Sequence, residues 1–298
     1  MIKINGEEID INHFPDGTQL LKYDPFKYVE YNISWHYEDD SELLTLIYLV
    51  NHIRSNDSRC KIKLNMPYIP NARMDRTKNI EEVFTLKYFV DVINSLNFDK
   101  VYVLDPHSDV SVALLNNVKV LSPNSYIEKV LISICDKYQI TKNDLVVYFP
   151  DAGAYKRYKD IPCLELFEKI YGEKVRDWST GKIMGLDIVD KDRKILDKPL
   201  TNKIILMVDD IISYGGTMYH SAKKINEFNP KTIFAYATHV EPKSFWDEYK
   251  GTFRIAFGFD GRAHYPIKQI VEKLYTTNSI YNFDENDFVI PMPINYEL

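Results

Sequence analysis

The sequence predicts an α/β protein built from two similar domains with mainly parallel sheets, spanning residues 1–142 and 143–298. Short apolar runs alternate with helical patterns, as they do where crossover helices connect parallel strands. Two such runs end in acidic residues about one domain-length apart, one at Asp105 and the other at Asp209 and Asp210. The tail of the second domain can pack back on the first.

The bulk composition is that of a soluble globular protein, with 45% hydrophobic and 27% charged residues. A net charge of -6 argues against a dedicated nucleic-acid binder, which usually carries a basic face. The three cysteines lack disulfide or metal spacing, which fits a reducing compartment. No signal-peptide core or membrane-length apolar run is present, so we expect a cytoplasmic protein with no membrane partner.

In the first domain, the apolar patterns predict a mixture of short strands and amphipathic helices. The expected strands are 2–4, 9–13, 28–33, 61–65 and 101–104, and the expected helices are 41–54, 80–96 and 126–138. Phe14-Pro15-Asp16-Gly17 predicts a turn, because Pro, Asp and Gly favour turn geometry.

In the second domain, strands again dominate the pattern. The expected strands are 145–149, 163–170, 183–189, 204–208, 232–239 and 275–279, with 288–294 as an edge strand. A polar break is expected over 172–180, and helices are expected from Met218 and near 268–274.

The stretch from Ile204 to Thr217 carries the clearest chemical signal. A short, β-branched apolar run is typical of a buried parallel strand, and this run ends in Asp209 and Asp210. The loop that follows consists of Ser213, Tyr214, Gly215, Gly216 and Thr217. Free backbone N–H groups and a hydroxyl at a helix N-terminus suit a phosphate, and carboxylates accept from sugar hydroxyls. The stretch therefore predicts a pocket for a phosphorylated sugar, although a tight turn before a capped helix would explain the same residues.

Charged side chains near other strand ends are weaker signals. Arg73 suits phosphate oxygens, and Asp75 could accept from an adenine amine or an arginine, although a solvated turn explains both. His107 could bind a phosphate or a metal, or could simply pack. Asp151 could hold Mg²⁺, or could belong to an Asp–Gly turn.

Lys174 and Arg176 lie in a polar segment between Gly172 and Gly181. Two positive charges on a closing loop would stabilise the charge that develops during phosphoryl transfer. A charged hairpin tip would account for the same two residues without any catalytic role.

The order of these motifs along the chain resembles the ribose-phosphate diphosphokinase family. The motifs are Phe-Pro-Asp-Gly, Pro-Tyr-x-Pro-x-Ala-Arg-x-Asp-Arg, Asp-x-His-Ser, Pro-Asp-Ala-Gly-x-x-Lys-Arg, Lys-x-Arg, Val-Asp-Asp-x-x-x-x-Gly-Gly-Thr, Ala-Thr-His and Thr-Asn-Ser. The resemblance covers nearly the whole chain and implies two phosphoribosyltransferase-like domains, assembled as a homo-oligomer of dimers such as a hexamer.

The resemblance also implies a role for each matching residue. ATP would be bound by Phe14, Asp16, Arg73, Asp75 and His107, the first two acting on a neighbouring subunit. His107 would also lie near Mg²⁺, and Asp151 would help to position a second Mg²⁺. Lys174, Arg176 and His107 would be catalytic. Asp209 and Asp210 would hold the ribose hydroxyls, and residues 213–217 would hold the 5-phosphate.

The chain departs from the family pattern at Ser213-Tyr214, where Asp-Thr is usual, at Met74, where Gln is usual, and at Thr18, where Glu is usual. The change at Ser213-Tyr214 leaves two acceptors open, ribose 5-phosphate and ADP-ribose. Diverged phage relatives resembling this family make ADP-ribose pyrophosphate for NAD⁺ rebuilding. The chain could instead be a phosphoribosyltransferase that consumes phosphoribosyl diphosphate, or a non-catalytic regulatory homologue of the synthetases.

Overall fold

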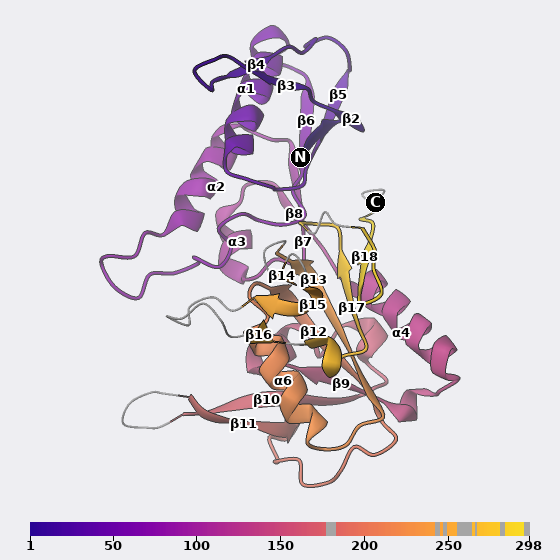
Figure 1. The fold of residues 1–298 in the computed structure, drawn as a ribbon. Coiled ribbons are helices and arrows are strands. Elements are labelled where there is room, and N and C mark those ends of the chain that lie inside the picture. Colours follow the sequence, from indigo (N-terminus) through magenta and orange to yellow (C-terminus); the bar gives the residue numbers. More distant parts are fainter. Residues whose placement is uncertain are drawn as a thin grey trace. The chain divides into compact units, whose positions relative to one another are not determined.

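The computed structural model describes residues 1–176, 183–241, 245–246, 249–254, 264–265, 267–280 and 284–294. The chain divides into two compact units, Met1–Ser122 and Pro123–Ile294 (Figure 1). Helix α4 (Asn124–Tyr138) belongs to the second unit, where the ring of Tyr138 lies 6.0 Å from that of Phe234. The expected join at 142/143 thus falls inside this unit, and the end of the tail lies outside the described residues.

The first unit contains a six-stranded sheet in the order β2-β1-β5-β6-β7-β8. Its strands are β1 (Ile2–Ile4), β2 (Glu7–Glu8), β5 (Glu30–Trp35), β6 (Lys61–Asn65), β7 (Lys100–Leu104) and β8 (Val118–Leu121). Strands β5 to β8 run parallel, and β1 pairs antiparallel with β2 and β5. A separate hairpin joins β3 (Ile11–His13) to β4 (Gln19–Leu21) across the predicted turn at Phe14–Gly17.

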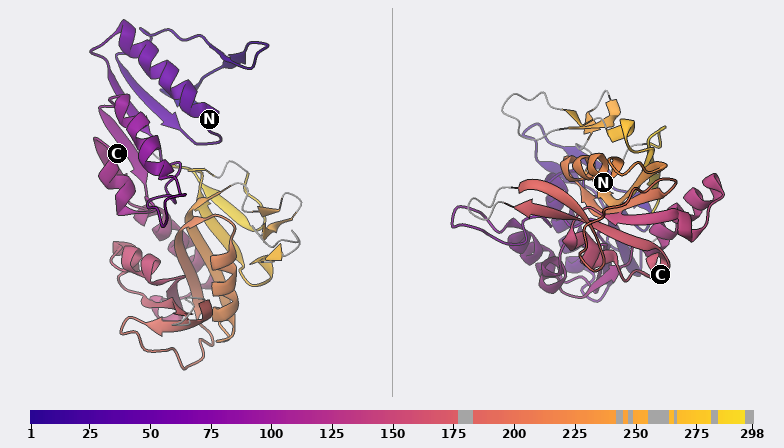
Figure 2. Two further views of the ribbon diagram at one scale, coloured as in Figure 1. Left: turned by 90° about the vertical axis from the view of Figure 1, so that its left-hand side faces the viewer. Right: turned by 90° about the horizontal axis from the view of Figure 1, so that it is seen from below.

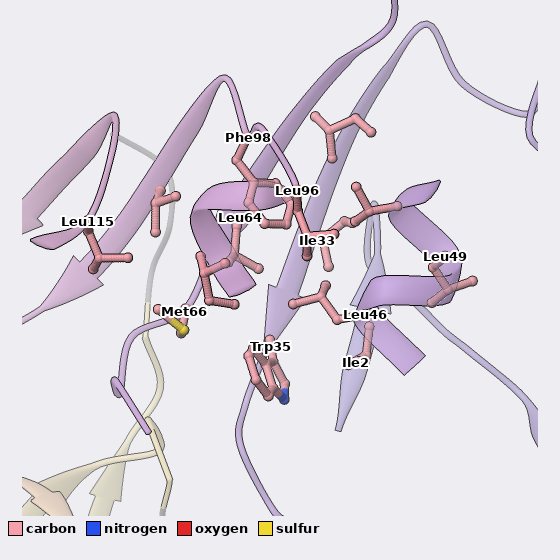
Figure 3. Packing of buried hydrophobic residues seen from close by; sticks show 14 of the residues in the cluster. Ile2, Ile33, Trp35, Leu46, Leu49, Leu64, Met66, Leu96, Phe98 and Leu115 are labelled. Atoms are coloured by element: carbon pink, nitrogen blue, oxygen red, sulfur yellow. The ribbon is translucent and has the colours of Figure 1, made fainter. Parts of the chain in front are cut away.

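Helices α1 (Ser41–Asn56), α2 (Thr85–Ser95) and α3 (Asp109–Leu114) complete the first unit. Ile33 and Trp35 of β5 share one buried cluster with Leu46 and Leu49 of α1 (Figure 3). The helix expected from residue 80 begins only at Thr85. The apolar pattern did not predict α3 or β8, because α3 is short and β8 has two exposed residues between its ends.

The second unit contains a seven-stranded sheet in the order β11-β10-β9-β12-β13-β17-β18. Its strands are β9 (Leu145–Phe149), β10 (Glu168–Arg176), β11 (Ile183–Asp190), β12 (Ile204–Ile212), β13 (Thr232–Val240), β17 (Lys273–Thr277) and β18 (Val289–Met292). All neighbours are parallel except β10 and β11. The connection from β9 to β10 runs toward one edge of the sheet, and the connection from β12 to β13 runs toward the other edge. The direction of the connections therefore reverses between the neighbouring strands β9 and β12. Such a switch point is where open α/β sheets bind ligands.

Helices α5 (Ala152–Tyr158) and α6 (Gly216–Asn226) follow β9 and β12. The remaining elements are the 3₁₀ turns η1 (Lys142–Asp144), η2 (Pro162–Leu164) and η4 (Ile267–Gln269) and the short sheet of β14 (Phe245–Trp246), β15 (Tyr249–Arg254) and β16 (His264–Tyr265). Among the described helices, none is long and apolar enough to cross a membrane.

Three expectations for the second unit are wrong in detail. The region expected as a strand over 163–170 begins with η2, and β10 starts at Glu168. The expected polar break over 172–180 is strand as far as Arg176, because the alternating polar residues form one arm of an antiparallel hairpin. The helix expected near 268–274 is η4 followed by β17, whereas the edge strand expected in the tail is confirmed as β18.

Candidate active site

The loop after β12 has the form expected of a phosphate-binding turn. Gly215 adopts φ 75°, a left-handed conformation that strains other residues, and α6 begins at Gly216. Thr217 lies exposed in the first turn of α6. Backbone N–H groups and the helix dipole therefore meet an accessible edge at which an anion can bind.

Asp210 is held by an arginine on a different element. Arg157 of α5 places Nη1 2.7 Å from Asp210 Oδ2, and the Asp210 side chain is only 7% exposed. Successive side chains of a strand point to opposite faces. Because Asp210 turns toward α5, Asp209 points toward the face that α6 covers.

Asp209 is half-buried and lies beside another carboxylate. Its Oδ1 accepts from the Asp210 backbone N–H at 3.0 Å. Burial and, next, the charge of Asp210 raise the pKa of Asp209 well above its usual range. The Arg157 guanidinium favours the charged form of the Asp210 carboxyl, whereas burial favours the protonated form of Asp209. An ionised Asp210 carboxylate can accept hydrogen bonds from sugar hydroxyls. The Asp209 side chain can bind a sugar hydroxyl in either of its protonation states, because a carboxylate accepts and a carboxylic acid can also donate.

Asp151 caps α5 at the end of β9. Its Oδ1 accepts from the backbone N–H groups of Gly153 and Ala154 at 2.9 and 3.0 Å. Its Oδ2 faces Lys174 Nζ at 3.6 Å. The expected Asp–Gly turn is thus a helix cap that fixes one carboxylate oxygen and aims the other at Lys174.

Lys174 projects from β10 within the β10–β11 hairpin, whose arms extend beyond the rest of the sheet (Figure 2). Gly172 is required at the base of this hairpin. A Cβ there would lie 2.6 Å from the Pro150 carbonyl oxygen and 2.7 Å from Tyr148 Oη. Arg176 is the last residue of β10, and its side chain and the connection 177–182 lie outside the described part of the chain.

Ser213 and Tyr214, two of the four residues at which the sequence departs from the resembling family, differ in their surroundings. Ser213 Oγ donates to Glu241 Oε2 at 2.6 Å, and Glu241 is anchored by its backbone N–H to Ile212. Tyr214 is 42% exposed. The Ser213 hydroxyl is therefore hydrogen-bonded to a carboxylate. The exposed Tyr214 ring offers an aromatic surface in the proposed phosphate-binding loop.

In the first unit, the carboxyl ends of β6 and β7 bring Asp75 and His107 together. Arg76 donates to Asp75 through Nε at 2.8 Å and Nη2 at 3.0 Å. These bonds, a hydrogen bond from Ser108 and the nearby His107 lower the pKa of Asp75. Asp75 thus accepts from an arginine, one of the two partners expected from the sequence, and Arg73 is exposed beside it.

Phe14 and Asp16 form the tip of the β3–β4 hairpin. Phe14 is 49% exposed. Asp16 Oδ1 accepts from the backbone and hydroxyl of Thr18 at 3.0 and 2.7 Å, which lowers the pKa of Asp16. Thr18, at the position where the family has Glu, therefore stabilises the turn itself.

No cluster of three or more His, Cys, Asp or Glu side chains suited to a metal occurs among the described residues. Asp151 Oδ2 is nevertheless a hard oxygen donor at the switch point, and His107 is half-buried beside Asp75. The Asp151 carboxylate in the second unit fits Mg²⁺, which usually keeps several waters and takes one or two carboxylates together with substrate phosphates.

Sequence reasoning assigned no role to Arg157 or Glu241. Arg157 occurs in the Pro-Asp-Ala-Gly-x-x-Lys-Arg motif, so its position was visible, but its partner Asp210 lies on a later strand. Glu241 follows β13 and belongs to no motif noted in the sequence. Both contacts depend on strands that are adjacent only in the folded sheet.

The chain resembles curated ribose-phosphate pyrophosphokinases. It is 27% identical to that of Pyrococcus abyssi over 231 residues, covering 78% of this chain and 75% of that protein. It is 25% identical to that of Thermococcus kodakarensis over 237 residues, covering 78% and 77%. No protein-family model matches the sequence.

A solved structure shows the same fold. The phosphoribosylpyrophosphate synthetase of Mycobacterium smegmatis superposes with a TM-score of 0.68 over 96% of this chain and 86% of that one, at 17% identity. The predicted α/β fold with two phosphoribosyltransferase-type domains and mainly parallel sheets is thereby confirmed.

Proposed function

Since the chain is a homologue of the ribose-phosphate pyrophosphokinases, we propose that it is a diphosphotransferase that uses MgATP. It would transfer the β,γ-diphosphoryl group to the anomeric hydroxyl of a ribose 5-phosphate moiety and release AMP. The observation that carries this proposal is the convergence of Asp151, Lys174 and the Asp209–Thr217 loop around the switch point of the second sheet.

Binding of the acceptor follows from the chemistry of the β12–α6 loop. Asp209 and Asp210 would accept from the ribose hydroxyls, with Arg157 fixing the orientation of Asp210. The N–H groups around Gly215 and Gly216 and the Thr217 hydroxyl would hold the 5-phosphate. In the first unit, Arg73, Asp75 and His107 would bind ATP, because an arginine suits phosphate oxygens and a histidine can donate to them.

The transfer step needs positive charge where the phosphoryl oxygens gain negative charge. The anomeric hydroxyl oxygen would attack the β-phosphorus and lose its proton to solvent. The bond between the β-phosphorus and the α,β-bridging oxygen would break, and AMP would leave with the electron pair. Lys174 and Arg176 would stabilise the transferred oxygens. When bound, one Mg²⁺ near His107 in the first unit and a second Mg²⁺ positioned by Asp151 in the second unit would neutralise and orient the phosphates.

The acceptor is the finer part of the proposal. Ser213 and Tyr214 replace the usual Asp-Thr, Ser213 is paired with Glu241, and Tyr214 is exposed. An aromatic face beside the 5-phosphate loop favours an acceptor that continues beyond the phosphate. We therefore propose ADP-ribose, giving ADP-ribose pyrophosphate for NAD⁺ reconstitution, as the acceptor, with ribose 5-phosphate as the competitor.

A homo-oligomer built from dimers is part of the same proposal. Phe14 exposes an aromatic ring at the tip of the β3–β4 hairpin. By analogy with the resembling family, this tip would contact adenine from a neighbouring subunit. Light scattering of wild type and Phe14→Ala, combined with KM for ATP, tests this role.

The decisive experiment incubates the purified protein with MgATP and each acceptor separately and measures AMP. We expect AMP release with ADP-ribose, and a Lys174→Ala variant serves as the matched inactive control. Release with neither acceptor would contradict the diphosphotransferase function, whereas release only with ribose 5-phosphate would refute ADP-ribose. Pyrophosphate release from phosphoribosyl diphosphate and a nucleobase would instead indicate a phosphoribosyltransferase.

A further inference from the structure

A cavity of about 500 Å³ lies in the second unit, where residues of α6 and of the β10–β11 hairpin line it. Among its lining residues are Lys174, Gly185, Thr217, His220, Lys223 and Lys224. The volume is within the range of about 300–1,000 Å³ that is typical of small-molecule sites. The cavity therefore begins at the proposed phosphate loop and at the catalytic lysine, and continues along the helix.

The charge of the cavity is predominantly positive. Lys174, Lys223 and Lys224 supply three cations, and the acidic lining residue, Glu227, pairs with Lys224 at 2.7 Å. Thr217, His220 and Lys224 recur at helical spacing, so they share one face of α6. From Thr217 to Lys224 the helix rises about 10 Å, farther than a single phosphate extends.

The opposite wall of the cavity is open enough for a bulky group. Gly185 and Leu186 of β11 line it, and a Cβ on Gly185 would meet no atom within 4 Å. Asp209 and Asp210 are not part of this lining, so the cavity extends away from the carboxylates that would hold the sugar hydroxyls. An occupant would thus enter from the 5-phosphate side.

We infer that this cavity binds the part of the acceptor that lies beyond its 5-phosphate: a second phosphoryl group held by Lys223, Lys224 and His220, and the nucleoside attached to it. This inference rests on the proposed function and assigns a place to the distal half of a dinucleotide-like acceptor such as ADP-ribose. Lysines on a helix face attract a phosphate as point charges, and Gly185 leaves space for the nucleoside.

Calorimetric titration with ADP-ribose and with ribose 5-phosphate tests the inference. In Lys223→Ala with Lys224→Ala, we expect at least about tenfold weaker binding of ADP-ribose, since two charge-assisted contacts are lost. Affinity for ribose 5-phosphate should change less than about twofold. Lys191→Ala, an exposed lysine outside the lining, is the matched control.

A second variant tests the space rather than the charge. Gly185→Phe places a bulky ring in the cavity from β11 and should weaken the binding of ADP-ribose but not that of ribose 5-phosphate. Thermal melting checks that the variant is folded. Equal effects on both ligands, or no effect on either, would overturn the cavity assignment. Because binding is measured directly, a wild type that binds ADP-ribose here but releases no AMP would contradict the proposed function alone.

Discussion

Arg157 on α5 and Asp210 on β12 form an ion pair, with Nη1 2.7 Å from Oδ2, that commits one of two adjacent carboxylates to the α5 side of the sheet. The Asp210 side chain is nearly buried, and the Arg157 guanidinium supplies a positive charge next to it. The Asp209 side chain points to the opposite face of the sheet. The two carboxyl groups therefore have different surroundings although they are neighbours in the sequence.

Loss of Arg157 should therefore affect both stability and acceptor binding. Arg157→Ala is expected to cost about 3 kcal/mol of folding free energy, because it removes the cationic partner of a buried carboxylate that lies beside another carboxyl group. It should also raise KM for the acceptor more than KM for ATP. Urea unfolding and steady-state kinetics measure the two effects. The double variant Arg157→Ala with Asp210→Asn should regain part of the lost stability but not the activity. Wild-type stability in the single variant Arg157→Ala would refute the role of this ion pair.

The raised pKa of Asp209 predicts a pH dependence of stability without ligands. In the unfolded chain this carboxyl ionises at its usual pKa near 3.9, whereas in the folded protein it stays protonated to higher pH. The folded state then binds more protons, so its stability falls as pH rises through the folded pKa. Asp209→Asn should remove this loss and raise Tm at neutral pH relative to wild type.

Melting curves from about pH 4 to pH 8, without ATP or Mg²⁺, check this expectation. Asp197→Asn, an exposed aspartate in the same unit, is the control and should leave the profile unchanged. In kinetics, Asp209→Asn should raise KM for the acceptor by about 10- to 100-fold through the lost hydrogen bond to a sugar hydroxyl. A Tm that falls at neutral pH would contradict the assignment.

Lys174 should affect turnover rather than substrate binding. Lys174→Ala removes a cation from the charge that develops on the transferred oxygens, so kcat should fall by about 10²- to 10³-fold with little change in KM for ATP. Rapid-quench measurement of AMP separates this step from product release. Lys174→Arg keeps the charge and should recover part of the rate; wild-type turnover by Lys174→Ala would show that the lysine is misassigned.

The Ser213-Tyr214 pair should control the choice of acceptor. Changing it to the usual family pair with Ser213→Asp and Tyr214→Thr is expected to lower the ratio of kcat/KM for ADP-ribose over ribose 5-phosphate by at least about tenfold. Ser213 faces Glu241, so Glu241→Gln must accompany the change to avoid two opposed carboxylates. Glu241→Gln alone is the control, and an unchanged ratio in the triple variant would contradict the role of this pair.

The β10–β11 hairpin should require glycine at position 172. Gly172→Ala places a methyl group 2.6 Å from the Pro150 carbonyl oxygen, a backbone atom that cannot rotate away. We expect a loss of about 1–3 kcal/mol in stability and a displaced Lys174. Gly185→Ala on the paired strand, where a Cβ meets nothing within 4 Å, is the matched control for melting. Equal Tm values for the two variants would refute the steric argument.

Much of the second unit was predictable because its strands are continuous apolar runs. Residues 145–149 were expected as a strand and residues 204–208 as a buried strand, and the two strands lie adjacent at the switch point. The second half of β10 was missed because residues 172–176 are mostly polar and begin with a glycine, a composition that predicts a loop when the partner strand is unknown. Helix α5 was not predicted because seven residues give too little periodicity.

The form of the loop after β12, a tight turn that leads into a helix, could be predicted from the sequence alone, because its glycines, carboxylates and threonine are neighbours along the chain and need no distant partner. The α/β class was predictable in the same way, through the alternation of strands and helices. The pairing of Arg157 with Asp210, the approach of Asp151 to Lys174 and the cationic cavity that continues from Thr217 emerge only in the folded protein. These relationships join residues on separate elements, and the order of strands in a sheet, which no local pattern encodes, brings them together.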